Sequence, residues 1–134
     1  MKQVKSVIIN EHDCPFEDWV KEGRDGVRWR TLLGGDRTQS EAITMGIVEI
    51  DPGRPDVLHL HQHEPAEGYY VVSGQGYVSI DGKKTQLQPG SAVYVPSNSL
   101  HAIGNDGQDT LKVLYVFAVD SFEDVKYIFP AKST

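Results

Sequence analysis

Short turns divide this chain at regular intervals, and their spacing limits the fold more than any other feature. Turn sequences rich in glycine, proline and aspartate recur about every eight to twelve residues, for example at 51–53, 81–82 and 89–90. The sequence holds 13 glycines and 7 prolines, and Asp-Gly at 81–82 is a strong signal for a β-hairpin. Because no long amphipathic helical pattern lies between the turns, we predict an all-β fold, a sandwich or a barrel.

The apolar segments between the turns predict a series of short strands. The predicted strands cover 3–9, 27–33, 42–50, 58–63, 68–72, 77–80, 85–87, 92–95, 101–103 and 110–118, and 125–129 is expected to be a final strand or an edge segment. A short helical segment is predicted over 13–20. Pro15 is tolerated in a first helical turn, and Glu17 and Asp18 suit the positive end of the helix dipole. Gly23 would end this helix.

Length, charge and cysteine content narrow the class of protein. The 134 residues, 39% of them apolar and 24% charged, suit one soluble domain with one core, made of an arm over about 1–25 and a barrel over about 26–130. A net charge of −6 disfavours nucleic acid and anionic membranes as partners. Cys14 is the single cysteine, and no segment approaches the roughly 20 apolar residues of a membrane span. We therefore expect a cytoplasmic protein.

Two imidazoles and one carboxylate lie within seven residues, at His61, His63 and Glu67. Residues two apart in a strand point the same way, so the two histidines share a face, and the turn at 64–65 can fold Glu67 back toward them. A third imidazole, His101, begins a later predicted strand. Such a set suits a borderline divalent metal such as iron, zinc, manganese, nickel or copper. We predict one such ion as a cofactor.

The spacing of these residues resembles the first sequence motif of the cupin family. That motif is His-x-His, three or four residues, Glu, six residues and Gly. Here His61-x-His63 is followed by three residues, Glu67, six residues and Gly74. The resemblance implies a single-domain cupin-type β-barrel, a jelly roll, with a metal bound by His61, His63, Glu67 and His101.

The second cupin motif is also recognisable, with one change. It reads Gly, five residues, Pro-x-Gly, two residues, His, three residues and Asn, and the chain matches it at Gly90, Pro96, His101 and Asn105. Asn98 stands where the motif has its second glycine. After glycine, asparagine is the residue that best tolerates a positive φ, so we expect Asn98 to preserve this turn.

His59 is a rival metal ligand. The glycine that precedes the first motif usually leaves five residues before the first histidine, and here Gly53 leaves seven before His61 but five before His59. We favour His61 and His63, because their spacing to Glu67 is tied to ligand geometry. His59 is then predicted to line the substrate pocket.

A narrower resemblance extends to small cupin lyases that cleave dimethylsulfoniopropionate. The pattern His-x-His-x-Pro-Ala-Glu-x-Tyr at 61–69 is similar to theirs, as are the segments 26–29 and 127–132. The resemblance implies a β-elimination in which a tyrosinate, Tyr69 or Tyr127, removes the α-proton as general base. The metal would act as a Lewis acid while dimethyl sulfide leaves and acrylate remains.

The same resemblance implies a pocket for a small-molecule substrate. We predict that Trp29, His59 and Tyr115 contribute to substrate binding, and that Trp29 holds the sulfonium by cation–π contact. Arg28 and Arg30 alternate with Trp29 along a predicted strand, so they are expected to face away from the pocket.

The sequence is compatible with other functions and does not fix the oligomeric state. An iron-dependent dioxygenase, an isomerase or epimerase, and a non-catalytic binding cupin all use similar ligands. A dioxygenase would need oxygen, whereas an elimination would not. The resemblance to small cupins, which often form dimers, implies a homodimer. A dimer could also cover an exposed sheet edge.

Overall fold

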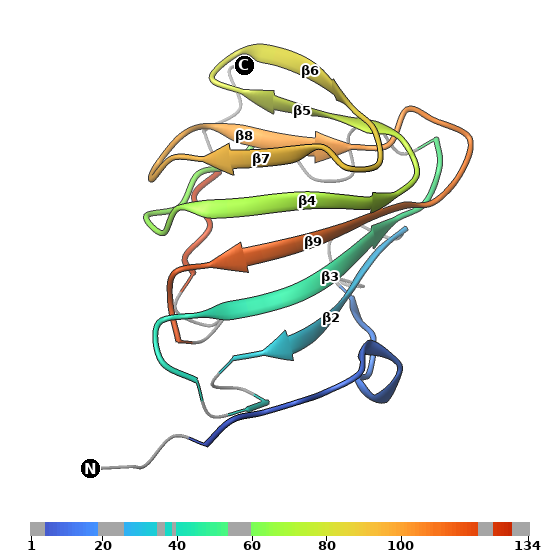
Figure 1. Ribbon diagram of the computed structural model, residues 1–134. Helices are drawn as coiled ribbons and strands as arrows, with labels where there is room; N and C mark the ends of the chain where they lie inside the picture. The colour runs from blue at the N-terminus through green and yellow to red at the C-terminus, as the bar shows by residue number, and fades with distance from the viewer. Residues whose placement is uncertain are drawn as a thin grey trace.

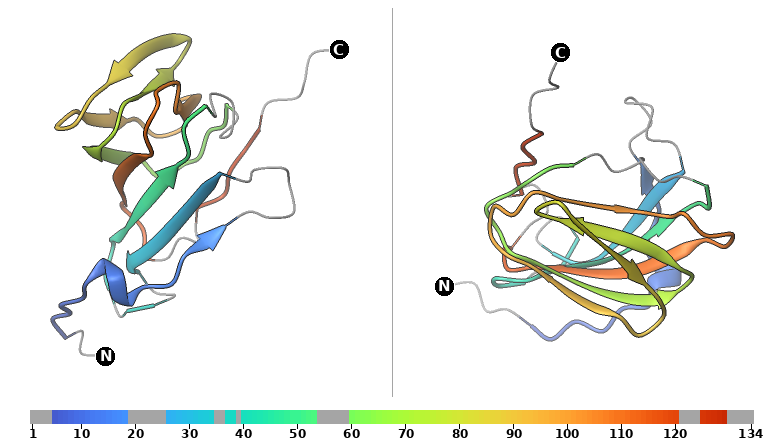
Figure 2. Two further views of the ribbon diagram at one scale, coloured as in Figure 1. Left: turned by 90° about the vertical axis from the view of Figure 1, so that its right-hand side faces the viewer. Right: turned by 90° about the horizontal axis from the view of Figure 1, so that it is seen from above.

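The computed structural model describes residues 5–18, 26–34, 37–38, 40–53, 60–120 and 125–129, and within them two antiparallel sheets face each other (Figures 1 and 2). The larger sheet has the strand order β1-β2-β3-β9-β4-β7, and the smaller has the order β6-β5-β8. The strands are β1 (Glu17–Asp18), β2 (Val27–Leu33), β3 (Thr44–Ile50), β4 (Glu67–Ser73), β5 (Gly76–Ile80), β6 (Lys83–Leu87), β7 (Ala92–Val95), β8 (His101–Gly104) and β9 (Leu111–Phe117). This arrangement confirms the predicted all-β fold.

The core lies between the sheets, and the central strands of the large sheet turn alternate side chains toward it. Along β9, fully buried and partly exposed positions alternate over the whole strand, as expected for a strand with one face against a core. Leu111 and Val113 of β9 are fully buried and pack in one cluster with Ile50 and Val71. The inner face of the large sheet is therefore the wall on which inward-facing functional side chains are mounted.

The segment that precedes β4 connects the small sheet to the C-terminal part of the chain. His61 forms an antiparallel bridge with His101 at the start of β8, and Gln62 forms one with Ile128. The backbone N–H of His61 donates to the carbonyl of His101 at 2.9 Å, and that of Gln62 donates to Ile128 at 2.8 Å. These bridges bring three distant parts of the sequence side by side.

The N-terminal arm is held on the outside of the large sheet by charged side chains. Lys112 of β9 forms a 2.6 Å ion pair with Glu11. The Arg30 guanidinium donates to the carbonyls of Glu11 at 2.6 Å and Cys14 at 3.3 Å, and it lies 3.8 Å from the centre of the Phe16 ring. Arg30 therefore faces away from the core, as the alternation predicted.

The predicted N-terminal helix is correct only in part. The structure has a three-residue 3-10 turn (η1, Glu11–Asp13), and Glu17 and Asp18 form β1 instead of a helix because they pair with Trp29 and Arg28 on β2. The helical preference over 13–20 is thus overridden by pairing with a strand whose residues lie ten to twelve positions away. Residues 19–25, with Gly23, lie outside the described residues.

Three predicted strands do not form regular strands among the described residues. Of 3–9, the described residues from 5 onward form no strand. In 58–63 and 125–129, only isolated bridges form among the described residues. Among the described residues, no helix is long and apolar enough to cross a membrane.

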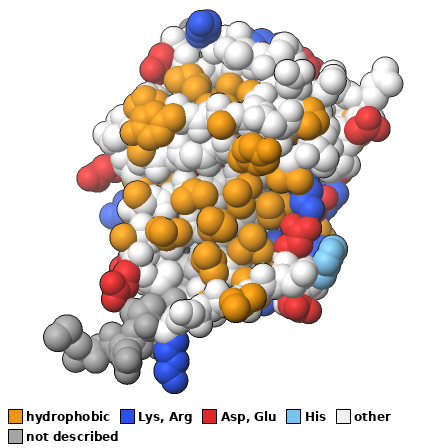
Figure 3. Space-filling view, in the orientation of Figure 1, with side chains coloured by type: hydrophobic (Ala, Val, Ile, Leu, Met, Phe, Trp, Pro, Cys, Tyr) orange, Lys and Arg blue, Asp and Glu red, His pale blue; other side chains and the backbone are white. Residues whose placement is uncertain are grey.

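Apolar side chains also gather on the outer face of the large sheet. Figure 3 shows them spread over the strands of this sheet in the orientation of Figure 1. Tyr70, Val72 and Tyr94 are large apolar residues with substantial exposure there, and Tyr94 is 69% exposed. These side chains have the opposite parity to the buried ones, so they belong to the outside and not to the cavity described next.

Candidate metal centre

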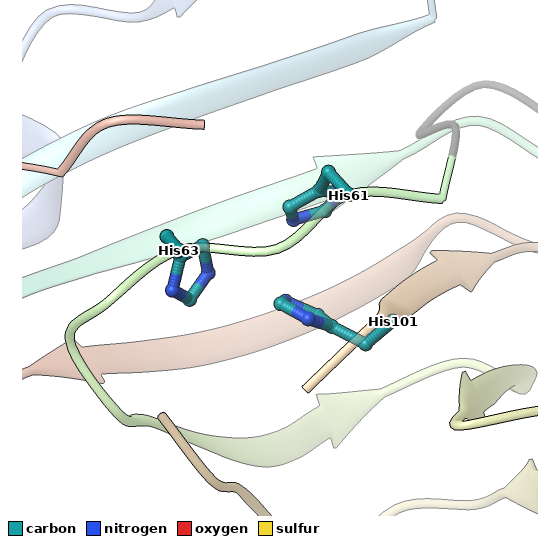
Figure 4. A group of neighbouring side chains, drawn as sticks. All are labelled: His61, His63 and His101. Carbon is teal, nitrogen blue, oxygen red and sulfur yellow. The ribbon is translucent and has the colours of Figure 1, made fainter. Parts of the chain in front are cut away.

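Three imidazoles converge on one buried point (Figure 4). His61 and His63 lie on the segment before β4, and His101 is the first residue of β8. Their ligand atoms all lie within 4.8 Å of one another, and the side chains are 2%, 0% and 0% exposed, respectively. The bridge between His61 and His101 makes these two residues cross-strand neighbours, which explains how residues forty positions apart come to share one site.

Two of the rings are fixed by backbone carbonyls. Nδ1 of His63 lies 2.8 Å from the carbonyl of Pro65, and Nδ1 of His101 lies 2.8 Å from that of Ser99. Because a carbonyl can only accept, each Nδ1 carries the proton and each Nε2 holds its lone pair toward the site. Metal-binding histidines are oriented in the same way in other proteins.

Glu67, the first residue of β4, completes the cluster. Its Oε1 atom lies 3.3 Å from Nε2 of His63 and 3.4 Å from Nε2 of His101. In the part of the chain that is described, neither Nε2 has a hydrogen-bond partner. Oε1 of Glu67 and the two Nε2 atoms are thus three buried acceptors that face one another. Such an arrangement is unfavourable unless a proton or a cation lies among them. The donor set of the three histidines and Glu67 therefore fits a divalent metal ion.

The electrostatics of this cluster favour added positive charge. Burial lowers the pKa of His63, but the close approach and negative charge of Glu67 raise it overall. Burial raises the pKa of Glu67, but the nearby imidazoles of His101 and His63 and the hydrogen bond from Tyr69 lower it overall. The carboxylate thus stays ionised within the protein, as a metal ligand must.

The turn before His101 is preserved despite the loss of its glycine. Asn98 has a φ of 61°, which confirms the expected left-handed conformation. Its backbone N–H donates to the carbonyl of His63 at 2.8 Å. The turn is thereby connected directly to the histidine pair.

A cavity of about 460 Å³, its open mouth included, adjoins the cluster. It is lined by Val27, Trp29, Val48, His61, Glu67, Tyr69, Ile103, Tyr115, Phe117 and Tyr127. These residues include five aromatic side chains and one carboxylate, and none of them is lysine or arginine. The cavity walls therefore suit a small molecule that presents a positively charged group to them.

The two tyrosines proposed from the sequence meet in this cavity. The phenol of Tyr69 donates to Oε1 of Glu67 at 2.8 Å. The ring of Tyr127 stacks on His61, with a centroid distance of 4.6 Å and an interplanar angle of 14°. Burial and the charge of Glu67 raise the pKa of Tyr69 well above its ordinary value, and both tyrosines line the cavity.

The other sequence-predicted residues are placed as follows. Trp29 and Tyr115 line the cavity, while His59 lies outside the described residues. Arg28 faces away and pairs with Asp51 at 2.9 Å. Phe117 was missed, although it is 1% exposed and its ring meets that of His63 edge-on at 5.2 Å. Its position two residues after Tyr115 on the same strand is the signal that would have found it.

Comparison with known proteins accounts for this geometry. The family model of the cupin domain matches residues 46–117, more than half of the chain. The chain belongs to the cupin family. This cupin is 37% identical over 125 residues to dimethylsulfoniopropionate lyase DddW of Ruegeria pomeroyi, an alignment that covers 93% of the chain and 80% of the relative.

Solved structures agree on the fold. The polyketide cyclase RemF of Streptomyces resistomycificus is similar to this cupin with a TM-score of 0.78 at 19% identity, over 96% of this chain and 88% of that one. A chain from the crystal structures of the dimethylsulfoniopropionate lyases RdDddP and RnDddQII has a TM-score of 0.71 at 20% identity, over 88% and 63%. At these identities the likeness establishes the architecture, and the chemistry has to be argued from the site.

Proposed function

We propose that this cupin is a metal-dependent lyase that cleaves dimethylsulfoniopropionate, or a similar small carboxylate, by β-elimination to acrylate and dimethyl sulfide. One observation carries the proposal: two phenols share an aromatic cavity with the cluster of three histidines and Glu67. The 37% identity to a dimethylsulfoniopropionate lyase over most of both chains supports it.

The ligands of the metal in this proposal are His61, His63, Glu67 and His101. The ion is one divalent iron, zinc, manganese or nickel, since imidazole and carboxylate donors accept each of these. When bound, such an ion supplies positive charge that polarises a carboxylate as a Lewis acid and lowers the pKa of a nearby phenol.

The cavity walls select the substrate by charge and shape. A sulfonium is a compact cation, and aromatic faces attract such cations by about 0.5–2 kcal/mol per contact. Trp29 and Tyr115 provide such faces in the cavity, and His59 is proposed to contribute from the neighbouring segment. A dianion would meet no lysine or arginine on the described lining. The walls therefore favour a zwitterion with a cationic end over a dicarboxylate.

The general base is Tyr69 or Tyr127. In its ionised form the phenolate takes the proton from the carbon next to the carboxylate. The electron pair of that C–H bond forms the new double bond as the C–S bond breaks, and the sulfur leaves with its bonding pair as neutral dimethyl sulfide. In the metal-free protein, burial and the charge of Glu67 raise the pKa of Tyr69 well above its ordinary value. Tyr127 lines the cavity and stacks on His61.

The proposal is tested by acrylate release from the metal-loaded protein, measured with and without oxygen. We expect turnover in both conditions. At saturating metal, Tyr69→Phe or Tyr127→Phe should lower kcat by about 100-fold or more, the range for losing a general base. Tyr94→Phe is the matched control, because Tyr94 is 69% exposed on the outer face. Full activity in both cavity variants, or binding without turnover in the natural protein, would contradict the proposal.

For the wider setting we propose a single cupin domain over 1–134 that acts as a cytoplasmic homodimer. The single cysteine is in keeping with a reducing compartment. The match of the cupin domain to residues 46–117 supports the domain, and the dimer is proposed because an exposed sheet edge needs covering. Sedimentation at micromolar concentration would measure the assembly.

A further inference from the structure

The edge strand β1 carries two acidic residues that lie on opposite faces of the large sheet. Glu17 pairs with Trp29 of β2, and Asp18 pairs with Arg28. Residues that pair directly across two antiparallel strands present their side chains to the same face. Because Trp29 lines the cavity, Glu17 lies on the cavity face of the edge strand and Asp18 lies on the outer face.

The position of Phe16, immediately before β1, agrees with this alternation. The guanidinium of Arg30 lies 3.8 Å from the centre of the Phe16 ring, and that of Arg28 lies 5.6 Å from it. Both arginines belong to the outer face, so Phe16 does as well. Successive side chains of an extended chain point to opposite sides, and the next side chain, that of Glu17, therefore points inward.

A hydrogen bond holds the Glu17 carboxylate on this inner face. The hydroxyl of Thr31 donates to Oε2 of Glu17 at 3.0 Å. Thr31 follows Trp29 by two residues on β2, so the two side chains share a face, and Thr31 is 7% exposed. Although Glu17 is exposed on the edge strand, its carboxylate is thereby fixed against the inner side of the sheet.

The negative charge of Glu17 has no basic partner in the part of the chain that the structure describes. Arg28 forms its ion pair with Asp51, and Arg30 donates to backbone carbonyls. Within the cavity lining, Glu67 is the charged side chain, and it is an acid too. Glu17 therefore adds a second negative charge on the side of the cavity formed by β2.

We propose that Glu17 is a specificity-determining residue, whose carboxylate next to Trp29 attracts the cationic end of the substrate and disfavours anionic ligands. The proposal rests on the proposed function for the identity of that substrate. An aromatic face and a nearby carboxylate both stabilise a sulfonium, so a zwitterion is oriented with its cationic end toward β2. The edge strand β1, which has no residue in the cavity lining, thus gains a functional role.

Two neutralising substitutions separate this charge from its neighbour. Glu17→Gln removes the charge and keeps a side-chain oxygen that accepts from Thr31. Asp18→Asn is the matched control, because it removes the same charge from the next residue of β1, on the opposite face.

Two probes of the same shape then separate charge from packing. The first is the betaine of β-alanine, in which a trimethylammonium group, a poor leaving group, replaces the sulfonium. The second is its analogue with a tert-butyl group in place of the trimethylammonium group. Calorimetry on the metal-loaded protein measures the Kd of each probe.

We expect Glu17→Gln to raise the Kd of the betaine about two- to fivefold, the range of an exposed charge pair, and to leave the Kd of the tert-butyl analogue unchanged. The increase should shrink at high salt, because exposed charges are screened. Asp18→Asn should change neither Kd. If Glu17 served only to prevent pairing between sheet edges, the ratio of the two Kd values would stay the same. An unchanged ratio in Glu17→Gln, or an equal change in Asp18→Asn, would overturn the proposal.

Turnover distinguishes this proposal from the proposed function. In the active protein, Glu17→Gln should raise the KM for dimethylsulfoniopropionate by about the same factor, with kcat changed less than twofold. A natural protein that releases no acrylate, but in which Glu17→Gln weakens binding of the betaine alone, would contradict the proposed function and support the role of Glu17. Acrylate release with an unchanged KM in Glu17→Gln would overturn the role of Glu17 and leave the lyase activity intact.

Discussion

The Tyr69 hydroxyl donates a 2.8 Å hydrogen bond to Oε1 of Glu67, the same oxygen that faces the imidazoles of His63 and His101. Tyr69 therefore orients a proposed metal ligand as well as lining the cavity. Removing such an orienting partner typically lowers metal affinity about 10–100-fold. Tyr69→Phe should show a decrease in this range, and Tyr127→Phe should not.

Competition with a chelator of known affinity measures this difference. Tyr127→Phe is a matched control, because it removes a phenol that lines the same cavity and stacks on His61. Equal metal affinity in the two variants would show that Tyr69 does not orient Glu67. Activity assays on Tyr69→Phe then need metal at saturation, so that loss of the base is not confused with loss of the ion.

Predictions from the sequence were most accurate for features that are determined by neighbouring residues. His61 and His63 share a face because of strand parity, and the left-handed turn at Asn98 was expected from residue type. Pairing between distant strands was not accessible in this way. For example, Thr31 pairs with Gly46, and Gly46 pairs with Tyr115, because of the register of β2, β3 and β9, and no local pattern sets that register.

The same reasoning explains the errors near the N-terminus. A proline followed by two acidic residues is a reasonable helix start, yet Glu17 instead pairs with Trp29 and accepts from Thr31. These contacts are tertiary, and tertiary contacts commonly override weak helical propensity. The segment at 58–63 was expected as a strand for its alternation, but its described part forms single bridges that hold His61 against His101.

Asn98 offers a test of the altered motif. Asn98→Gly restores the usual residue and should leave the free energy of unfolding nearly unchanged. Asn98→Ala should lower it by about 1 kcal/mol, because an ordinary side chain pays this cost at positive φ. Urea unfolding measures both values. If alanine is tolerated as well as glycine, then the φ of 61° is not what selects asparagine here.

The ion pair between Lys112 and Glu11 predicts a pH dependence. The hydrogen bond and charge of Lys112 lower the pKa of Glu11 below 4.5 despite partial burial. A lowered carboxyl pKa stabilises the fold above the unfolded pKa, and this stabilisation is lost as the pH falls through the folded pKa. Lys112→Met should therefore lower the free energy of unfolding at pH 7 by up to about 1 kcal/mol.

That difference between Lys112→Met and the natural protein should shrink as the pH falls below 4.5. Denaturant unfolding at neutral and acid pH measures it. Lys84→Met is the control, since the Lys84–Asp106 pair is longer, at 3.7 Å, and the lysine side chain is 57% exposed. A Lys112→Met deficit that is the same at every pH would mean that packing, and not the ion pair, holds the arm.

Gly74 and Gly82 have nearly the same φ, so substituting each of them separates the effect of backbone strain from that of steric crowding. Gly74 has a φ of +83° and Gly82 one of +86°. A Cβ at Gly74 would lie 2.3 Å from the carbonyl oxygen of Thr110, whereas nothing lies within 4 Å of one at Gly82. Gly82→Ala should cost about 1 kcal/mol from backbone strain alone. Gly74→Ala adds overpacking of about 1–3 kcal/mol against backbone that cannot rotate away, so it should be clearly the less stable in chemical denaturation. A Gly74→Ala variant that does not fold, beside a Gly82→Ala variant that does, would also agree with this prediction. Equal stability of the two variants would contradict it and show that Gly74 is needed only for its φ.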